Sequence, residues 1–350
     1  FQVMLRTPAE PEHVGHIAER IIERLSQSYR VDGHIISIGA SIGIAVSKGE
    51  VVNADDLLRS ADVALYQAKT DGRGVYRIFD PAMDEALQRK RDVGEILREA
   101  INQGHLELHY QPVVDNNTGR IVACEALVRL RHPVQGLVPP SEFIEIAEQT
   151  GLIVPLGDWV LRRACKDSAT WPKHVRVAVN FSPKQFVICK DLIADIREAL
   201  ADAGLAPHRL EVEVTESTII EAKDSLAMLS EISAMGVKIS LDDFGTGYSS
   251  LSYLRQFPVD KIKIDRSFAM DIKSRASQAV IGSVSVLSQL LNVELVIEGV
   301  ETAEQLQALK MWNVHLIQGF FFCRPRPLPE IMPLLLNPAP FSAEPIQSVA

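Results

Sequence analysis

The chain has 350 residues, of which 47% are hydrophobic, so it is long enough to bury the core of one large domain and of a smaller one. Its formal net charge of −9 disfavours non-specific binding to duplex DNA or to anionic membranes, and we expect neither as a partner of this fragment. The four cysteines have no paired spacing, which argues against a disulfide framework or a zinc site, and no apolar run is long enough to span a bilayer.

Residues 1–80 show the alternating pattern of a small α/β unit. The elements that the pattern predicts, in chain order, are a strand at 1–5, a helix around 17–25, a bent strand at 34–46, a helix at 54–74 and a strand at 75–79. Two or three strands are too few for a complete sheet. Because the chain also begins inside a predicted strand, we expect a fragment with targeting or sensory segments upstream.

The rest of the chain predicts a connecting helix, a barrel and a tail. Residues 81–103 predict one charged helix, which we interpret as a linker rather than a dimerising coil because no heptad persists. Residues 104–336 alternate strands with helices, a pattern typical of parallel strands in a closed or doubly wound sheet, and their number suits a single TIM-like (β/α) barrel. Residues 337–350 are rich in proline and small side chains and predict a flexible tail.

Six short apolar segments of the predicted barrel carry an acid or an amide at or near their ends. These polar residues are Glu125, Asn180, Glu213, the pair Asp242 and Asp243, Glu298 and Gln318, and a seventh segment places Lys263 in the same way. A (β/α) barrel builds its active site from the C-terminal ends of successive strands. Oxygen ligands with one amine, and without a set of histidines or cysteines, indicate Mg²⁺ or Mn²⁺ rather than zinc.

Alternation along two strands supports a shared site. Glu211 and Glu213 lie on the opposite face of their strand from the neighbouring valines. Lys261 and Lys263 lie on the opposite face of theirs from the neighbouring isoleucines. Carboxylates that converge at strand ends repel each other strongly unless divalent ions lie between them.

The adjacent acids Asp242 and Asp243 are the most specific local signal. One aspartate can bridge two ions about 4 Å apart while its neighbour binds only one, which is the arrangement of a two-metal hydrolytic site. For Lys263 two interpretations stay open. It could form a salt bridge at the edge of the core, or it could hold a metal-bound water and stabilise developing charge.

Nine sequence strings in the second part of the chain resemble the EAL domain of bacterial cyclic di-GMP phosphodiesterases. Between about residues 85 and 335 they run in the order YQPVV, EALVRL, FIEIAE, VNFS, EVTES, DDFGTGYSSL, DKIKID, EGVET and QGFFFCRP. The strings SIGIAV and ADVALYQAKTDGRG of residues 1–80 resemble the C-terminal part of a GGDEF (diguanylate cyclase) domain. The remainder of that domain is not in this chain, so we do not expect this chain alone to cyclise GTP.

The resemblance implies a site for two ions, Mg²⁺ or Mn²⁺. The ligands implied for the first ion are Glu125, Asn180, Glu213 and Asp242. Those implied for the second are Asp242, Asp243 and Glu298. Lys263 would contact the nucleophilic water and would form the catalytic set with Glu125 and Glu298.

Other residues are implied to bind substrate or to support the site. Gln111, Arg129 and Gln318 would lie along the substrate groove, with Gln318 also holding ligands or water. Glu216 and Glu301 would support the DDFGTGYSS loop. Three positions depart from the family pattern, namely Leu130 in place of Trp, Phe320 in place of Tyr and Cys323 in place of Ser. None of the three removes a ligand, and they concern the packing of the guanine bases.

The resemblance implies hydrolysis of one phosphodiester bond of cyclic di-GMP to linear 5′-pGpG in bacterial second-messenger signalling. It also implies a homodimer through the EAL domain and a cytoplasmic location, which leaves open a membrane tether upstream. One alternative is a catalytically silent receptor for cyclic di-GMP. Another is an unrelated barrel metalloenzyme that acts on a small acid.

Overall fold

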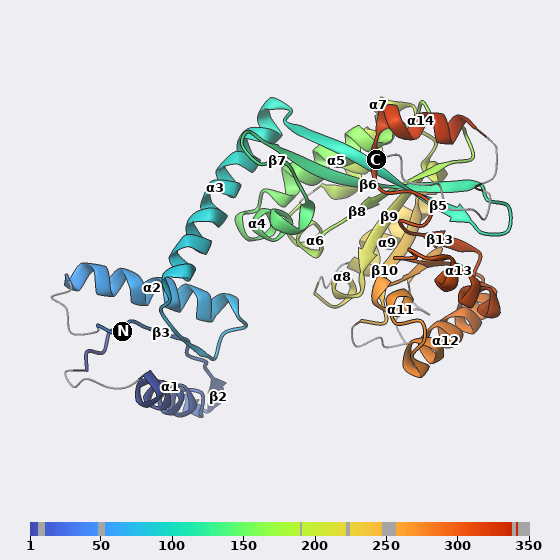
Figure 1. Cartoon of the computed structure of the whole chain (residues 1–350). Helices are drawn as coiled ribbons and strands as arrows, with labels where there is room; N and C mark the ends of the chain where they lie inside the picture. Colours follow the sequence, from blue (N-terminus) through green and yellow to red (C-terminus); the bar gives the residue numbers. More distant parts are fainter. Residues whose placement is uncertain are drawn as a thin grey trace. The chain divides into compact units, whose positions relative to one another are not determined.

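The computed structural model of the protein describes residues 1–5, 11–47, 53–189, 191–221, 225–246, 257–337 and 341. By its contacts the chain divides into two units, Phe1–Val93 and Gly94–Ala350 (Figure 1). The predicted domain boundaries at residues 80, 103 and 336 stay predictions. One continuous helix, α3 (Pro81–Gln103), crosses the division between the two units. Among the described residues no helix combines the length and the apolar composition needed to cross a bilayer.

The described part of the first unit contains two pairs of strands and two helices besides the start of α3. Its elements are α1 (Pro11–Leu25), β1 (Ser28–Val31), β2 (His34–Ser37), β3 (Ile42–Ile44), α2 (Ala54–Thr70) and β4 (Tyr76–Ile78). β1 pairs antiparallel with β2, and β3 pairs parallel with β4. The side chain of Asn53 caps α2 by accepting a hydrogen bond from the N–H of Asp55. Both predicted helices and the last predicted strand are confirmed.

Two predictions for this unit are wrong. Residues 1–5 were expected as a strand, but they are exposed and irregular, and no described strand pairs with them. The bent strand expected at 34–46 is two strands, β2 and β3, which belong to different sheets. β2 belongs instead to a hairpin with β1, whose turn at Asp32 and Gly33 has positive φ angles of 51° and 82°. An Asp-Gly pair suits such a two-residue turn and was the overlooked signal.

The second unit is a closed barrel of eight strands (Figure 1). In order around the barrel they are β5 (Leu106–Asp115), β13 (Leu316–Gln318), β12 (Glu294–Ile297), β11 (Lys261–Ile264), β10 (Lys238–Phe244), β9 (Leu210–Thr215), β8 (Arg176–Asn180) and β6 (Ile121–His132). β6 pairs with β5 and closes the ring, while β7 (Gly136–Val138) and β14 (Arg326–Pro327) extend its edges. The TIM-like architecture predicted from the sequence is confirmed.

One strand departs from the expected parallel order, because β5 is antiparallel to both β6 and β13. Only a short turn joins β5 to β6. In that turn the Asp115 carboxylate accepts hydrogen bonds from the N–H groups of Asn117 and Thr118, and Gly119 has a φ of 67°. A turn this short permits only antiparallel pairing, since a parallel crossover needs a dozen or more residues.

Helices follow the other strands of the barrel, as predicted. The described α-helices of the second unit after α3 are α4 (Ile144–Thr150), α5 (Ile153–Ser168), α6 (Pro183–Ile188), α7 (Leu192–Ala203), α8 (Glu216–Glu221), α9 (Ser225–Ala234), α11 (Arg266–Met270), α12 (Arg275–Leu291), α13 (Ala303–Leu309) and α14 (Leu328–Leu336). Three short 3₁₀ turns lie at Pro140–Glu142, Pro207–Arg209 and Lys310–Trp312. The helices bury the outward faces of the strands, where Val177, Val212 and Ile239 are almost inaccessible.

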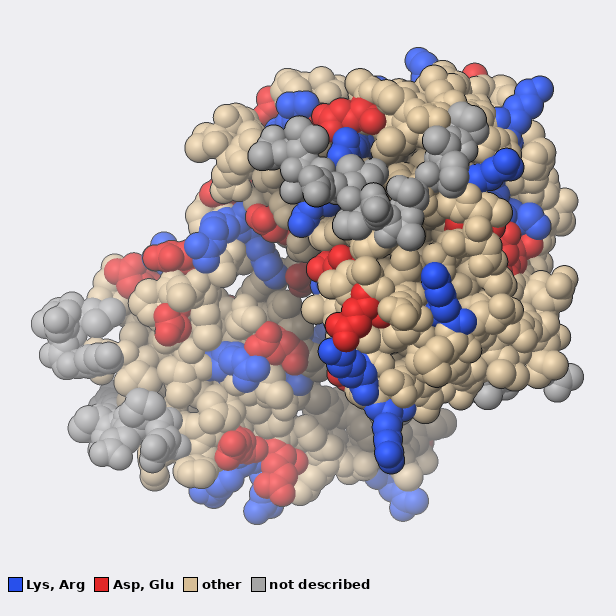
Figure 2. All heavy atoms as spheres, turned by 45° about the vertical axis from the view of Figure 1, so that its right-hand side comes forward, with Lys and Arg blue, Asp and Glu red and all other residues tan. Residues whose placement is uncertain are grey.

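The inside of the barrel is apolar on one side and polar on the other. The apolar side, formed by neighbouring strands β6, β5, β13 and β12, carries the buried cluster Val113, Ala123, Val296 and Leu316. Across the barrel, β9, β10 and β11 place Glu211, Ser240 and Lys261 in the interior, and all three are buried. Figure 2 shows basic and acidic side chains interspersed among uncharged residues on the face that it draws.

Candidate functional site

Lys263 of β11 lies at the centre of a group of carboxylates near the C-terminal ends of the barrel strands. Its side chain is 1% exposed, and its Nζ lies 2.6 Å from Glu298 Oε1 and 2.9 Å from Glu213 Oε2. Asp242 Oδ2 lies 3.2 Å from the same nitrogen, and Glu125 Oε2 lies 3.5 Å from it. Four carboxylates from four different strands or strand ends therefore converge on one ammonium group, as the strand-end pattern predicts.

Two amides join this group through Glu125. Asn180 Nδ2 donates a hydrogen bond of 2.6 Å to Glu125 Oε1, and Gln318 Nε2 donates one of 2.5 Å to Glu125 Oε2. Gln318 Nε2 also lies 3.3 Å from Gln111 Oε1, which brings the predicted substrate residue Gln111 into the same cluster. The buried Gln318 Oε1 has no hydrogen-bond partner among the described residues. A buried oxygen without a partner beside the acids indicates a place for a further donor or cation.

The charges of the site do not balance. Burial raises the pKa of Glu213 well above its usual range and that of Glu298 to about 8, although Lys263 acts in the opposite direction. Burial would lower the pKa of Lys263, but the surrounding carboxylates outweigh it and raise that pKa. When all four acids are ionised, one ammonium leaves excess negative charge in a buried place, so the site calls for protons or further cations.

Two groups of acids have the spacing of metal ligands. Glu125, Glu213 and Asp242 form one, and Asp242, Asp243 and Glu298 form the other; within each group one oxygen per residue lies within 4.8 Å of the others. Asp242 belongs to both groups, as expected for a bridging ligand. Hard oxygen donors in this number fit Mg²⁺ or Mn²⁺.

Asp243 takes part in the second group because β10 is irregular at this point. Successive side chains of a regular strand point to opposite faces, so two adjacent aspartates would not meet at one site. The register with β11 shifts between Leu241 and Phe244, and Asp243 has a φ of 53°, in the left-handed region. Its N–H donates to Asp242 Oδ1 at 3.0 Å. The bulge turns Asp243 back towards its neighbour, at the cost of local backbone strain.

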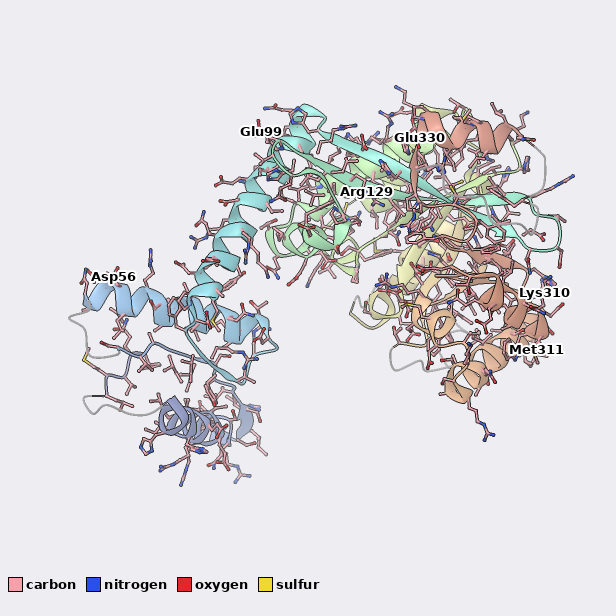
Figure 3. All side chains as sticks on the ribbon, viewed as in Figure 1. Asp56, Glu99, Arg129, Lys310, Met311 and Glu330 are labelled. Atoms are coloured by element: carbon pink, nitrogen blue, oxygen red, sulfur yellow. The ribbon has the colours of Figure 1, made fainter. Side chains whose placement is uncertain are left out.

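The residues predicted around the rim differ in what they contact. Arg129 lies on β6 (Figure 3), where it is half-buried and on the same face as Glu125. Its Nη1 donates a hydrogen bond to the carbonyl of Val128. Glu216 begins α8 and accepts a hydrogen bond of 3.2 Å from the N–H of Gly245, at the start of the DDFGTGYSS loop. Residues 247–250 of that loop lie outside the described residues. Glu301 is exposed, and its carboxylate has no hydrogen bond or ion pair within the described part of the chain.

A second group of charges, which the sequence indicated only through strand alternation, lies one layer deeper in the barrel. Glu211 and Lys261 precede Glu213 and Lys263 by two residues on the same strand faces, and they are in direct contact with each other. Arg176, at the start of β8, joins this pair. No function was predicted for these residues, because an alternating acid or base within a strand does not by itself reveal its partner.

Gly299, directly after Glu298, is expected to be sensitive to substitution. Its φ is 70°, and a Cβ at this position would lie 2.4 Å from Arg266 Cβ. We expect Gly299→Ala to lower the free energy of unfolding by roughly 1–3 kcal/mol, from backbone strain plus the clash, and to displace Glu298. Urea unfolding measures the first effect. Gly204→Ala is the matched control, since Gly204 has a φ of 61° but open space around it; equal losses in the two variants would contradict the expected clash.

Comparisons with known proteins agree with this geometry. Residues 95–325 match the family described as EAL domain, and residues 1–75 match the family described as diguanylate cyclase, GGDEF domain. The chain is 40% identical over 336 residues to the bifunctional diguanylate cyclase/cyclic di-GMP phosphodiesterase MucR of Pseudomonas aeruginosa, a match that covers 94% of this chain and 49% of that protein. It is 39% identical over 324 residues to the cyclic di-GMP phosphodiesterase NbdA of the same organism, covering 91% of this chain and 41% of that protein.

A solved structure supports the same assignment. The structure described as PaMucR Phosphodiesterase, c-di-GMP complex, is similar with a TM-score of 0.66 at 41% sequence identity, and the match covers 69% of this chain and 99% of that one. The present chain spans less than half the length of MucR or NbdA. The chain belongs to the EAL domain family, and its EAL domain is preceded by part of a GGDEF domain.

Proposed function

We propose that this chain hydrolyses one phosphodiester bond of cyclic di-GMP and releases linear 5′-pGpG, with two divalent ions, Mg²⁺ or Mn²⁺. The observation that carries the proposal is the convergence of four carboxylates on the buried Lys263, in two overlapping groups with metal-ligand spacing. The names of MucR and NbdA, and the ligand in the related solved structure, support the choice of substrate.

The candidate ligands, five acids and one amide, would divide between the two ions. Glu125, Asn180, Glu213 and Asp242 would hold one, and Asp242, Asp243 and Glu298 the other. When bound, the ions supply Lewis-acid chemistry that stabilises the negative charge developing on the phosphate oxygens.

The side chains of the protein would position the reactants. Lys263, fixed by carboxylates on several sides, would orient the attacking water through an N–H hydrogen bond and offset charge as the bond to phosphorus forms. Gln318, whose Oε1 is free to accept within the described part of the site, would hold a water or a ligand beside Glu125. Gln111 lies on the face of β5, and Arg129 on the face of β6, that points towards the site. Both side chains would contact the dinucleotide. Glu216 would fix the start of the DDFGTGYSS loop through Gly245.

The direct test is incubation of the chain with cyclic di-GMP and Mg²⁺, followed by separation of the nucleotides. We expect 5′-pGpG to accumulate. Binding of cyclic di-GMP without a product would support the silent receptor instead, although every implied ligand is present in this chain. Failure of the dinucleotide to bind at all would favour a barrel metalloenzyme with another substrate.

Removal of divalent ions should abolish turnover reversibly. Excess chelator is expected to reduce the rate below detection, because the excess carboxylates cannot then hold the phosphate. Restored Mg²⁺ or Mn²⁺ should recover the rate, as measured by product formation after dialysis. Circular dichroism of the chelated protein is the control for folding. A rate that persists in chelator would contradict the metal assignment.

The homodimer through the EAL domain also stays a proposal. If the dimer is the active form, the rate per chain should rise with protein concentration through the range in which sedimentation shows dimerisation. A rate per chain that stays constant through that range would argue against it. The cytoplasmic location and the support of the loop by Glu301 are likewise predictions that await a test.

A further inference from the structure

We propose that the deeper layer of charges in the barrel, comprising Arg176, Glu211, Lys261 and Glu294, sets the affinity of the metal site above it. This inference rests on the proposed function, because it assumes that the upper acids bind divalent ions. It assigns to these four side chains a positioning role and no contact with substrate.

The four side chains form one connected network. Glu211 is 1% exposed and lies between two cations: Lys261 contacts its Oε2, and Arg176 Nε lies 2.6 Å from its Oε1, as an ion pair without hydrogen-bond geometry. Arg176 Nη2 also donates to Glu294 Oε2 at 2.7 Å, and Lys261 Nζ lies 3.8 Å from the same oxygen. Two cations face two carboxylates, so the layer as a whole carries no net charge.

The network lies close beneath the candidate metal ligands. Glu211 and Lys261 each precede a residue of the upper site by two positions, and two residues along a strand span about 7 Å. Two of the interior positions that neighbour Glu211 and Lys261 carry small side chains: Ala178 pairs with Glu211 on β8, and Ser240 pairs with Lys261 on β10. Ser240 is fully buried, and its Oγ has no hydrogen-bond partner among the residues that the structure describes. At these two positions little bulk separates the two layers, and charges in such a buried place are poorly screened by salt.

The neutrality of the deeper layer has two consequences for the upper one. Because Glu211 is already paired with Arg176 and Lys261, it does not draw Lys263 away from the upper acids. The negative charge that attracts divalent ions then comes from the upper acids alone. Removing a single charge from the deeper layer should therefore shift the metal affinity, and the direction should follow the sign of the charge removed.

The experiment measures Mn²⁺ binding directly, by the electron paramagnetic resonance signal of the free ion, on the full chain without substrate. Glu211→Gln leaves the layer positive and should weaken Mn²⁺ binding by about tenfold. Lys261→Met leaves it negative and should tighten binding by a similar factor. The double variant restores neutrality and should bind within about threefold of the unchanged chain. Simple structural damage would weaken binding in both single variants, so shifts in the same direction would overturn the proposal.

A milder variant keeps the test decisive if the buried variants do not fold. The Glu294 side chain is 41% exposed, so Glu294→Gln should fold, and it should weaken Mn²⁺ binding measurably because it removes a negative charge from the same layer. The matched control is Glu304→Gln, because Glu304 forms only a surface ion pair with Lys273. This variant should leave the affinity for Mn²⁺ unchanged. Equal affinities for Mn²⁺ in Glu294→Gln and Glu304→Gln would overturn this inference and leave the proposed function standing. Absence of Mn²⁺ binding in the unchanged chain would instead overturn the metal site of the proposed function, and this inference with it.

Discussion

Glu125→Gln is expected to lower the turnover of cyclic di-GMP by about a thousandfold or more while the barrel stays folded. The glutamate is buried, accepts hydrogen bonds from Asn180 and Gln318, and lies beside Lys263. Glutamine has nearly the same volume, so packing survives, but the charge that would hold a divalent ion is lost. The loss should appear in kcat and in the affinity for Mn²⁺ together, because both depend on the same carboxylate.

A matched variant separates the ligand role from a general loss of charge. Glu231→Gln removes a carboxylate from the exposed face of α9, where Glu231 lies 3.9 Å from Arg197. It should retain the full rate and the full affinity for Mn²⁺. If Glu125→Gln also retained the full rate, the first ligand group would be assigned wrongly, whatever the behaviour of the control.

Lys263→Met is expected to lower the free energy of unfolding of the metal-free protein by roughly 3–5 kcal/mol. The methionine fills a similar volume, but it leaves Glu125, Glu213, Asp242 and Glu298 without their shared ammonium. Divalent ions should offset part of this loss, because they supply positive charge to the same oxygens and bind only the folded chain. Urea unfolding with and without Mg²⁺ should therefore show a larger stabilisation by the ion in this variant than in the unchanged protein.

Turnover by Lys263→Met should remain low even when Mg²⁺ restores its stability, because the group proposed to orient the attacking water is missing. Lys273→Met serves as the control, since Lys273 forms only an exposed pair with Glu304, and it should change neither stability nor rate by much. If the free energy of unfolding of Lys263→Met were unchanged and did not depend on Mg²⁺, the carboxylates would not need the ammonium.

Much of the barrel and its site was predictable, because both are encoded in local patterns. Strands followed by helices imply parallel neighbours, and polar residues at strand ends imply a common mouth. These two signals suffice to gather the four carboxylates and Lys263 at one end of the barrel, where the structure places them. The family resemblance added the substrate and the division of the ligands between two ions.

Features that depend on backbone geometry or on pairing across the barrel were not predictable. The reversed direction of β5 follows from the short turn at residues 116–120, which apolar periodicity does not report. Asp243 was predicted as a ligand from the adjacent acids, but the bulge and the left-handed φ that turn its side chain towards the site have no signature in the letters DD. The pairing of Glu211 with Arg176 depends on which strands become neighbours, since the two residues lie on different strands, β9 and β8.

The reversed strand β5 also decides where the chain enters the barrel. Since β5 runs against its neighbours, its first residues lie at the mouth: Glu107 pairs with Arg129, and the carbonyl of His105 accepts a hydrogen bond from the N–H of Arg131. Helix α3 ends at Gln103, so it delivers the chain to the end of the barrel where the candidate site lies, whereas a regular barrel receives its first strand from the opposite end. A new upstream domain that is joined directly to β5 would thus connect at the end of the barrel that carries the carboxylates, and the length and phase of the joining helix become design variables for the proposed activity.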